Sequence, residues 1–444
     1  MKKIRNLPEG SFLKLLFAFW ASFFLIAAFC MPDRANMLPG LWQILSQPSK
    51  LTCSYFALGG YAATFLNMGL VCCICLGLFV IFKGTPNNAS TLAVILTTGF
   101  GVWGINILNL WPSVFGVWLY CLIKKEKFGP NVNAMLFSTG IAPLLTDLMI
   151  RYPNDQVVGF NLTGILLSLL VGAVIGFFLP AGLAFSPKVH KGFDLYSAAL
   201  PVGMTAFFLH GILYKAPGVA VPDPVGELHL ADPVIVNGFC IALFGSLVLA
   251  ALLMGGTWRD YWRLLTDPDP VVNFSAAYGN ATMLMNVGLY GLYILLYYNL
   301  IGAEFNGVTF GVIFCMLSTC NSGSHPGNVW PIMLGYVLAS TVCGWLSPLV
   351  GGNFTLAINA QAIMVGLCYA NGLSPISSKY GWRYSFIAAM AHYCMVTMIP
   401  SLHGGFCLYN GGFTAALVCL VLVPPMEKFF RSKADRMAIR AAKK

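Results

Sequence analysis

Long apolar stretches recur through this sequence from residue 11 to residue 425, separated by short polar breaks. Only 9% of the 444 residues are charged, whereas a soluble domain carries about 25%. A transmembrane helix needs about 20 mostly apolar residues, and its backbone must form its hydrogen bonds internally in lipid. Barrel strands would alternate polar and apolar residues, and runs such as 165–179 do not. The pattern therefore predicts an all-α, polytopic helical membrane protein.

The positive charge is concentrated near the C-terminal end. Seven of the 25 lysines and arginines lie in residues 428–444, and the net charge of the chain is +10. Such a tail is typical of a cytoplasmic anchor attracted to anionic lipid headgroups. Nucleic acid is not an expected partner, because neither aromatic interleaving nor a nucleic-acid-binding fold accompanies these charges.

The first apolar stretch, residues 11–30, follows three basic residues as a signal sequence would. It is long for a signal core and no small-x-small cleavage site follows it, so we expect an uncleaved first helix. The 14 cysteines lie mostly inside apolar stretches, without zinc-type spacing to histidine. We expect them to act as small packing residues, and we expect no metal and no cofactor.

The two halves of the sequence match when the chain is shifted by 219 positions. The matched pairs include Asn67 with Asn286, Asn87 with Asn306, Gly104 with Gly323, Asn109 with Asn328, Trp111 with Trp330, and Pro112 with Pro331. With other offsets, 140–144 matches 372–376 and 190–196 matches 403–409. We therefore expect an N-terminal helix and loop (1–56), a first membrane repeat (57–214), a linker loop with one unmatched span (215–275), a second membrane repeat (276–425) and the basic tail (426–444).

Each repeat contains an apolar segment broken by Gly, Asn and Pro, at 91–123 and 307–347. In the first repeat each arm spans about 20 Å as a helix, which is less than the hydrocarbon core of about 30 Å. We therefore predict two re-entrant hairpins and about ten full spans. With the N-terminus inside, this arrangement places ten lysines and arginines in inside loops and four outside, whereas single crossings give five and nine. The prediction is two inverted repeats in a plasma membrane, with both termini cytoplasmic.

Inverted hairpins should bring their tips together near the midplane of the membrane. Irregular backbone at that depth must be buried or line a polar cavity, and half-helix N-termini favour an anion or a polar solute. The substrate-binding candidates are Asn106 and Asn109 in the first tip and Asn321, Ser322, Ser324, His325 and Asn328 in the second. Asn109 and Asn328 are also natural N-cap residues, which is compatible with substrate contact. The second tip is the stronger candidate, although its polar groups could simply bond to one another.

The motif His-x-Gly-Phe-x-Leu-Tyr occurs once in each repeat. It contains His190 and Tyr196 in the first repeat, and His403 and Tyr409 in the second. These residues could gate a pathway or relay protons. The alternative is an ordinary membrane-interface histidine beside a tyrosine of the aromatic belt.

The second half carries the strings Asn-x-x-Pro-Ile-Met-x-Gly (328–335), Gly-Leu-Ser-Pro-Ile (372–376) and Leu-His-Gly-Gly-Phe-x-Leu-Tyr-Asn (402–410). They resemble an uncharacterised bacterial family of multi-pass membrane proteins with a duplicated domain, domain of unknown function family 1576. The resemblance covers most of the chain and implies no substrate and no catalytic residue.

Three functions fit this pattern to different degrees. A secondary carrier would bind a small polar or anionic solute between the hairpin tips. A passive channel for a small neutral solute would also suit the scarcity of charge inside the spans. A membrane-embedded enzyme needs a cluster of acid, base or metal ligands, which the sequence does not suggest. The expected partners are the lipid bilayer, a small-molecule solute and, for a coupled carrier, an ion; a homo-oligomer is compatible with the pattern.

Overall fold

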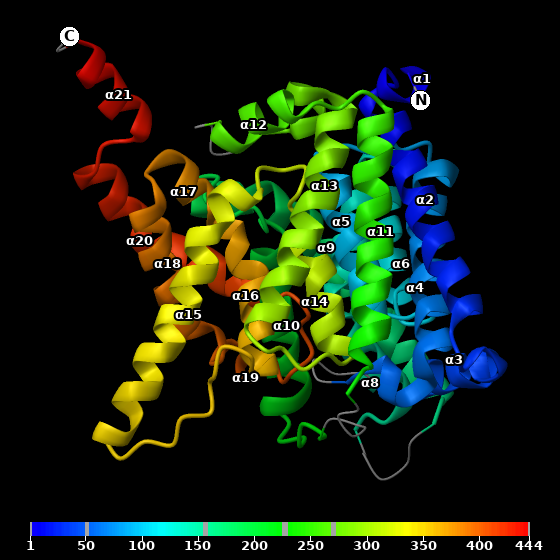
Figure 1. Cartoon of the computed structure of the whole chain (residues 1–444). Helices are drawn as coiled ribbons and strands as arrows, with labels where there is room; N and C mark the ends of the chain where they lie inside the picture. The colour runs from blue at the N-terminus through cyan, green and yellow to red at the C-terminus, as the bar shows by residue number, and fades with distance from the viewer. Residues whose placement is uncertain (1, 49–52, 154–158, 224–229, 268–271, 443–444) are drawn as a thin grey trace.

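The computed structural model describes residues 2–48, 53–153, 159–223, 230–267 and 272–442. Every regular element in these residues is helical (Figure 1). Eight helical segments in this part of the chain are long and apolar enough to cross a membrane: Glu9–Cys30, Tyr55–Ile81, Gly129–Ile150, Leu162–His190, Pro233–Leu253, Phe274–Leu300, Pro326–Leu349 and Asn410–Ile439. The chain is therefore a multi-pass membrane protein, as its apolar pattern predicts.

The helices form two series. The first contains α1 (Lys2–Arg5), α2 (Glu9–Cys30), α3 (Met37–Ser46), α4 (Tyr55–Ile81), α5 (Asn88–Gly99), α6 (Trp111–Lys124), α7 (Val132–Ser138), α8 (Ala142–Ile150), α9 (Leu162–His190) and α10 (Ala199–His210). The second contains α11 (Pro233–Leu253), α12 (Trp258–Thr266), α13 (Phe274–Leu300), α14 (Gly307–Leu317), α15 (Pro326–Leu349), α16 (Gln361–Ala370), α17 (Ser374–Lys379), α18 (Trp382–Val396), α19 (Ile399–Leu402), α20 (Asn410–Phe429) and α21 (Lys433–Ala442).

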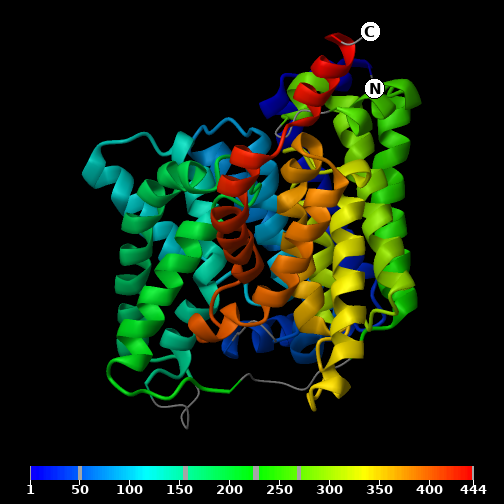
Figure 2. The same cartoon turned by 90° about the vertical axis from the view of Figure 1, so that its left-hand side faces the viewer.

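Both ends of the described chain lie on the same side of the molecule. In Figure 1, α1, α12 and α21 are at one end, and α3 is at the other. Helix α2 runs from the first end to α3, α11 runs back to α12, and α13 returns from α12. Figure 2, turned by 90°, again shows the two termini at one end.

The long helices α4 and α13 are kinked at equivalent positions. Gly60 in α4 and Gly279 in α13 both have φ of 82°, and they are 219 residues apart. A side chain with a Cβ rarely adopts this conformation, so each kink requires glycine. The same local geometry therefore occurs in both halves at the spacing found in the sequence.

Three of the predicted spans are not continuous long helices. Residues 194–214 contain α10, which continues into the π-helix Gly211–Lys215; residues 355–376 contain α16 and the start of α17; and residues 381–400 contain α18 and the start of α19. The chain before α10 is not helical, although Tyr196 within it is buried. Conversely, α15 has 24 residues and qualifies as a span, although its segment was predicted to be part of a hairpin. The eight candidate spans therefore include α15, which was expected to be part of a hairpin, and do not include the three interrupted segments.

Two short turns interrupt helices inside the bundle. The 3-10 turn Thr139–Ile141 joins α7 to α8, and the 3-10 turn Asn371–Leu373 joins α16 to α17. A proline follows each turn in the first residues of α8 and α17. Proline has no N–H to donate and suits the first turn of a helix, so it helps to restart each helix after the break.

The two halves exchange backbone hydrogen bonds at these breaks. The N–H of Leu195 donates to the carbonyl of Gly372 at 3.0 Å, and the N–H of Leu408 donates to the carbonyl of Gly140 at 2.9 Å. Leu195 and Leu408 are equivalent residues of the His-x-Gly-Phe-x-Leu-Tyr motifs. Each motif therefore completes the broken helix of the other half.

Helices α6 and α9 approach each other closely through glycine. A Cβ on Gly116 would lie 1.9 Å from the carbonyl oxygen of Gly172, and a Cβ on Gly176 would lie 1.9 Å from the carbonyl carbon of Gly116. Gly172 and Gly176 are four residues apart on α9, the spacing at which small residues let membrane helices pack backbone to backbone. This contact has no room for any side chain.

Candidate functional site

The first tip, residues 103–110 between α5 and α6, is clamped by Asn67 of α4. The side-chain amide of Asn67 donates to the carbonyls of Gly101 and Ile105, at 2.8 and 3.0 Å. Its oxygen accepts the N–H of Ile107 at 3.2 Å. Both polar atoms of this fully buried side chain are therefore satisfied.

Asn106 and Asn109 are bonded within the first tip. Asn109 Oδ1 accepts the N–H of Asn106 at 2.9 Å, and Asn109 Nδ2 donates to Thr146 Oγ1 at 2.8 Å. Asn106 Oδ1 accepts the N–H of Asn109, and Asn106 Nδ2 donates to the carbonyl of Ile44 at 3.4 Å. The prediction that Asn109 is an N-cap is wrong, because α6 begins two residues later and Asn109 bonds inside the tip.

The second tip, residues 318–325 between α14 and α15, is clamped in the same way by Asn286 of α13. The amide of Asn286 donates to the carbonyls of Cys320 and Ser324, at 2.8 and 3.0 Å, the same two bonds displaced by 219 positions. The oxygen of Asn286, however, has no partner. The residue equivalent to Ile107 is Pro326, which has no N–H to donate.

Two further buried polar atoms around the second tip have no partner. One is Ser275 Oγ, in the residue whose N–H donates to Asn321 Oδ1 at 3.0 Å. The other is Nδ1 of His325, whose side chain is 3% exposed. Burying an unpaired polar group costs about 1–3 kcal/mol, so these atoms around the second tip are candidate points of contact for another group.

A seam of hydroxyl and amide groups connects the second tip to α17. Ser324 Oγ accepts a hydrogen bond from Thr319 Oγ1 at 2.7 Å and lies 3.1 Å from Ser374 Oγ. Asn328 Nδ2 donates to Ser378 Oγ at 3.1 Å. These contacts join the start of α15 to both ends of the short helix α17. Asn328 lies in the first turn of α15 rather than at its N-cap, because Pro326 already begins the helix.

Asn371, at the break between α16 and α17, is the most highly connected residue of this seam. Its Nδ2 lies within hydrogen-bond distance of Tyr290 Oη, the Met316 carbonyl and Thr319 Oγ1, at 2.9, 2.6 and 2.9 Å. Its Oδ1 accepts the hydroxyl of Tyr196 at 2.9 Å. The side chain thus joins the C-terminal ends of α14 and α16 to the motif of the first half.

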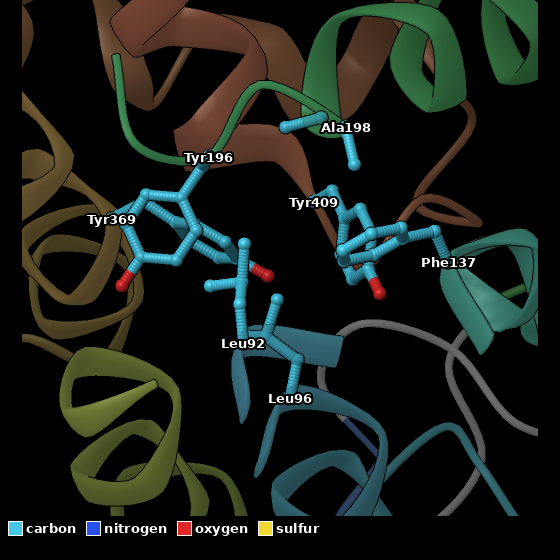
Figure 3. Close-up of a pocket in the computed structure, with 8 residues that line it drawn as sticks. Leu92, Leu96, Phe137, Tyr196, Ala198, Tyr369 and Tyr409 are labelled. Atoms are coloured by element: carbon cyan, nitrogen blue, oxygen red, sulfur yellow. The ribbon is translucent and has the colours of Figure 1, made fainter. Parts of the chain in front are cut away.

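Three tyrosines meet where the two halves join (Figure 3). The rings of Tyr196 and Tyr369 have centroids 4.7 Å apart, and those of Tyr369 and Tyr409 have centroids 6.2 Å apart. Together with Leu92, Leu96 and Phe137 they line a space too narrow to admit a water molecule. The hydroxyl of Tyr196 is bonded, whereas the buried hydroxyl of its equivalent, Tyr409, has no partner.

The two motif histidines are buried and make equivalent contacts. His190 Nε2 lies 2.9 Å from Ser197 Oγ, and His403 Nδ1 lies 2.5 Å from Asn410 Oδ1. Position 410 is equivalent to position 197 in the second motif. These contacts suit a structural role, and the gating or proton-relay role stays a prediction.

The two tips do not face each other. Thr91 at the start of α5 accepts a hydrogen bond from Asn321 in the second tip at 3.3 Å. Gly307 at the start of α14 lies beside the 3-10 turn that follows α5: a Cβ added to Gly307 would be 3.1 Å from the carbonyl oxygen of Val102. Helices α5 and α14 thus lie side by side in opposite directions. The predicted approach of the tips at mid-depth is wrong, because α5 and α14 each carry their tip about 16–18 Å beyond their own start.

The sequence prediction favoured the second tip as the candidate site and did not include the residues that surround it. In the sequence, Asn286 could be recognised as the match of Asn67. The replacement of Ile107 by Pro326 at the matched position of the second half could also be recognised. Asn371 stands directly before the Gly-Leu-Ser-Pro string, where an amide inside an apolar stretch is costly unless bonded. In the described part of the chain no three His, Cys, Asp or Glu side chains are grouped as metal ligands.

The fold and this site define a multi-pass helical membrane protein with a buried, carboxylate-poor polar centre. The chain belongs to the family described as protein of unknown function (DUF1576), whose model matches residues 33–215 and 254–428. The match in two segments is consistent with a tandem duplication. No curated protein and no solved structure shows a significant match to the chain.

Proposed function

We propose that this protein is a secondary carrier for a small polar or anionic solute, which binds at the second tip and the break between α16 and α17. The first turn of α15 meets α17 there, and the N-terminus of a long helix such as α15 carries a partial positive charge. Discontinuous helices of this kind surround the substrate in many carriers.

The observation that carries this proposal is the difference between the two tips. In the first tip the polar atoms of Asn67, Asn106 and Asn109 are all bonded. Around the second tip the oxygen of Asn286, the hydroxyl of Ser275 and one ring nitrogen of His325 are buried without a partner. The first tip also buries an unpaired donor, Nε1 of Trp103. The difference is therefore specific to the clamp: the oxygen of Asn67 accepts a hydrogen bond, whereas the oxygen of Asn286 does not.

The proposal includes an inverted arrangement of two repeats, each with one re-entrant hairpin. It is supported by the equivalent clamps 219 residues apart and by the opposite directions of α5 and α14. The sequence of a long apolar helix, a short helix and a kinked long helix occurs twice, as α2–α3–α4 and α11–α12–α13. We therefore propose that each repeat also includes its first helix, so that residues 234–254, unmatched in the sequence, correspond to α2.

We also propose that the end of the molecule that carries both termini faces the cytoplasm of a plasma membrane. Helix α12, which contains Arg259 and Arg263, lies at this end with α1, which contains Lys2 and Lys3, and with α21 of the basic tail (Figure 1). Lysine and arginine are enriched in cytoplasmic loops. The second tip would then approach the cytoplasmic side, since Phe274 at the start of α13 donates its N–H to the Asn321 carbonyl.

A channel for a neutral solute is the second candidate, favoured by the near absence of charge in the seam. A channel and a carrier differ in their kinetics. In proteoliposomes, a carrier should show saturable uptake and accelerated counterflow when unlabelled solute is loaded inside. Non-saturating flux without counterflow would instead indicate a channel. An enzyme is the third candidate, and the described residues contain no group of three or more His, Cys, Asp or Glu side chains that could hold a catalytic metal ion.

The site is tested by ligand-dependent thermal stabilisation of the purified protein. A library of small polar and anionic solutes is expected to contain one that raises the unfolding midpoint of the wild type. Ser324→Ala and His325→Ala should abolish this rise, because they remove groups of the second tip. Asn106→Ala is the matched control, since Asn106 is the equivalent of His325 in the first tip. The proposed site is wrong if the tip variants respond like the wild type, or if Asn106→Ala alone loses the response.

A further inference from the structure

The side-chain oxygen of Asn286 is a hydrogen-bond acceptor to which no group donates. Its side chain is fully buried in the middle of α13. The orientation of the amide is fixed, because the group that points at the two carbonyls of Cys320 and Ser324 must be the N–H₂ donor. The unpaired atom is therefore the oxygen.

The other half of the protein shows what normally fills this place. In the first tip the equivalent oxygen, Asn67 Oδ1, accepts the N–H of Ile107. In the second tip Pro326 stands at the position of Ile107 and has no N–H. The second half thus keeps the clamp of the first and leaves out the one donor that would complete it.

The short tip that Asn286 clamps carries several other neutral oxygen atoms. The carbonyls of Cys320 and Ser324 accept hydrogen bonds from the nitrogen of the same side-chain amide. Thr319 Oγ1 and Ser324 Oγ belong to the same short tip and lie 2.7 Å apart. The tip also follows the C-terminal end of α14, which carries partial negative charge and favours a cation.

We infer that the second tip binds a dehydrated monovalent metal cation, with Asn286 Oδ1 as a ligand supported by oxygen atoms of residues 319–324. A hard cation selects oxygen ligands, and the absence of carboxylates from the named oxygen atoms favours a single charge over two. This inference rests on the proposed function, for which it supplies the coupling ion. Binding of the cation beside the N-termini of α15 and α17 would also add positive potential for an anionic solute.

The test is the unfolding midpoint of the full-length purified protein, measured in sodium, potassium, lithium or choline chloride at constant ionic strength, with no solute added. The wild type should be stabilised by at least one alkali cation relative to choline, about 100-fold in the folding equilibrium when the cation is at about 100 times its dissociation constant. Pro326→Ile introduces the residue found at position 107 and supplies the missing N–H. It should abolish the cation effect while leaving the protein at least as stable as the wild type in choline.

Pro331→Ala is the matched control. It removes a proline from the same helix, one turn further on, without adding a donor to Asn286, and it should keep the full cation effect. A wild type equally stable in all four salts would overturn the inference, and so would a Pro326→Ile variant with an unchanged cation effect. These outcomes are separate from those of the solute screen. A cation effect without any solute hit would contradict the proposed carrier only, and a solute hit without a cation effect would contradict the cation site only.

Discussion

Replacing Asn371 with alanine is expected to destabilise the folded protein by about 3 kcal/mol and to abolish solute-dependent stabilisation. The side chain is fully buried and joins α13, α14 and Tyr196 at the break between α16 and α17. Its removal leaves the Met316 carbonyl and the hydroxyl groups of Tyr196, Tyr290 and Thr319 with fewer partners in an apolar interior. Unfolding midpoints of the variant, with and without the stabilising solute, measure both effects.

Thr139→Ala is the control for this prediction. Thr139 occupies the equivalent position in the first half, but its hydroxyl only donates to the Leu136 carbonyl within its own helix at 2.6 Å. Its loss should cost about 1 kcal/mol or less and should leave the response to solute intact. Equal effects of the two variants would mean that the seam has no special role in the second half.

Replacing Gly176 with leucine should have an even larger effect on folding. A Cβ alone at this position would lie 1.9 Å from the carbonyl carbon of Gly116, so the side chain would force α6 and α9 apart. We expect a loss of more than about 4 kcal/mol, in the range where single substitutions prevent folding. The yield of monodisperse protein after detergent extraction measures this outcome.

Gly245→Leu in α11 provides the comparison. A Cβ at Gly245 would meet no atom within 4 Å, so leucine has open space on the outside of the bundle. This variant should be extracted with the same yield as the wild type. If both leucine variants behaved alike, the close packing of α6 on α9 would not be needed for folding.

The sequence was sufficient to predict the class of fold and the equivalences between its halves. Apolar stretches require helices in lipid, and the polar residues retained 219 positions apart, such as Asn67 and Asn286, form the same clamp in both halves. The sequence did not predict that residues 191–198 enter the bundle without helical structure. Composition alone does not distinguish a buried helix from a buried irregular segment. The predicted span at 194–214 begins with this non-helical stretch, whereas the predicted span at 355–376 becomes helical only at residue 361 and is interrupted by the turn Asn371–Leu373.

The second tip was predicted as the stronger site because it concentrates hydrogen-bonding residues, and those residues are buried together. Its relation to the first tip was not predictable, since it depends on how far α5 and α14 extend past each other. The roles of Asn286 and Asn371 also required the structure. Their sequence neighbours are apolar, and their partners lie on other helices.

The reciprocal hydrogen bonds of Leu195 and Leu408 bear on how this chain matures during synthesis. When the ribosome has made only the first 220 or so residues, the N–H of Leu195 and the carbonyl of Gly140 have been inserted without their eventual partners, Gly372 and Leu408. Until the last helices are inserted, lipid, the insertion machinery or trapped water would have to shield these polar groups of the early segment. Neither half should persist when expressed alone, whereas co-expression of the two could restore both bonds at once.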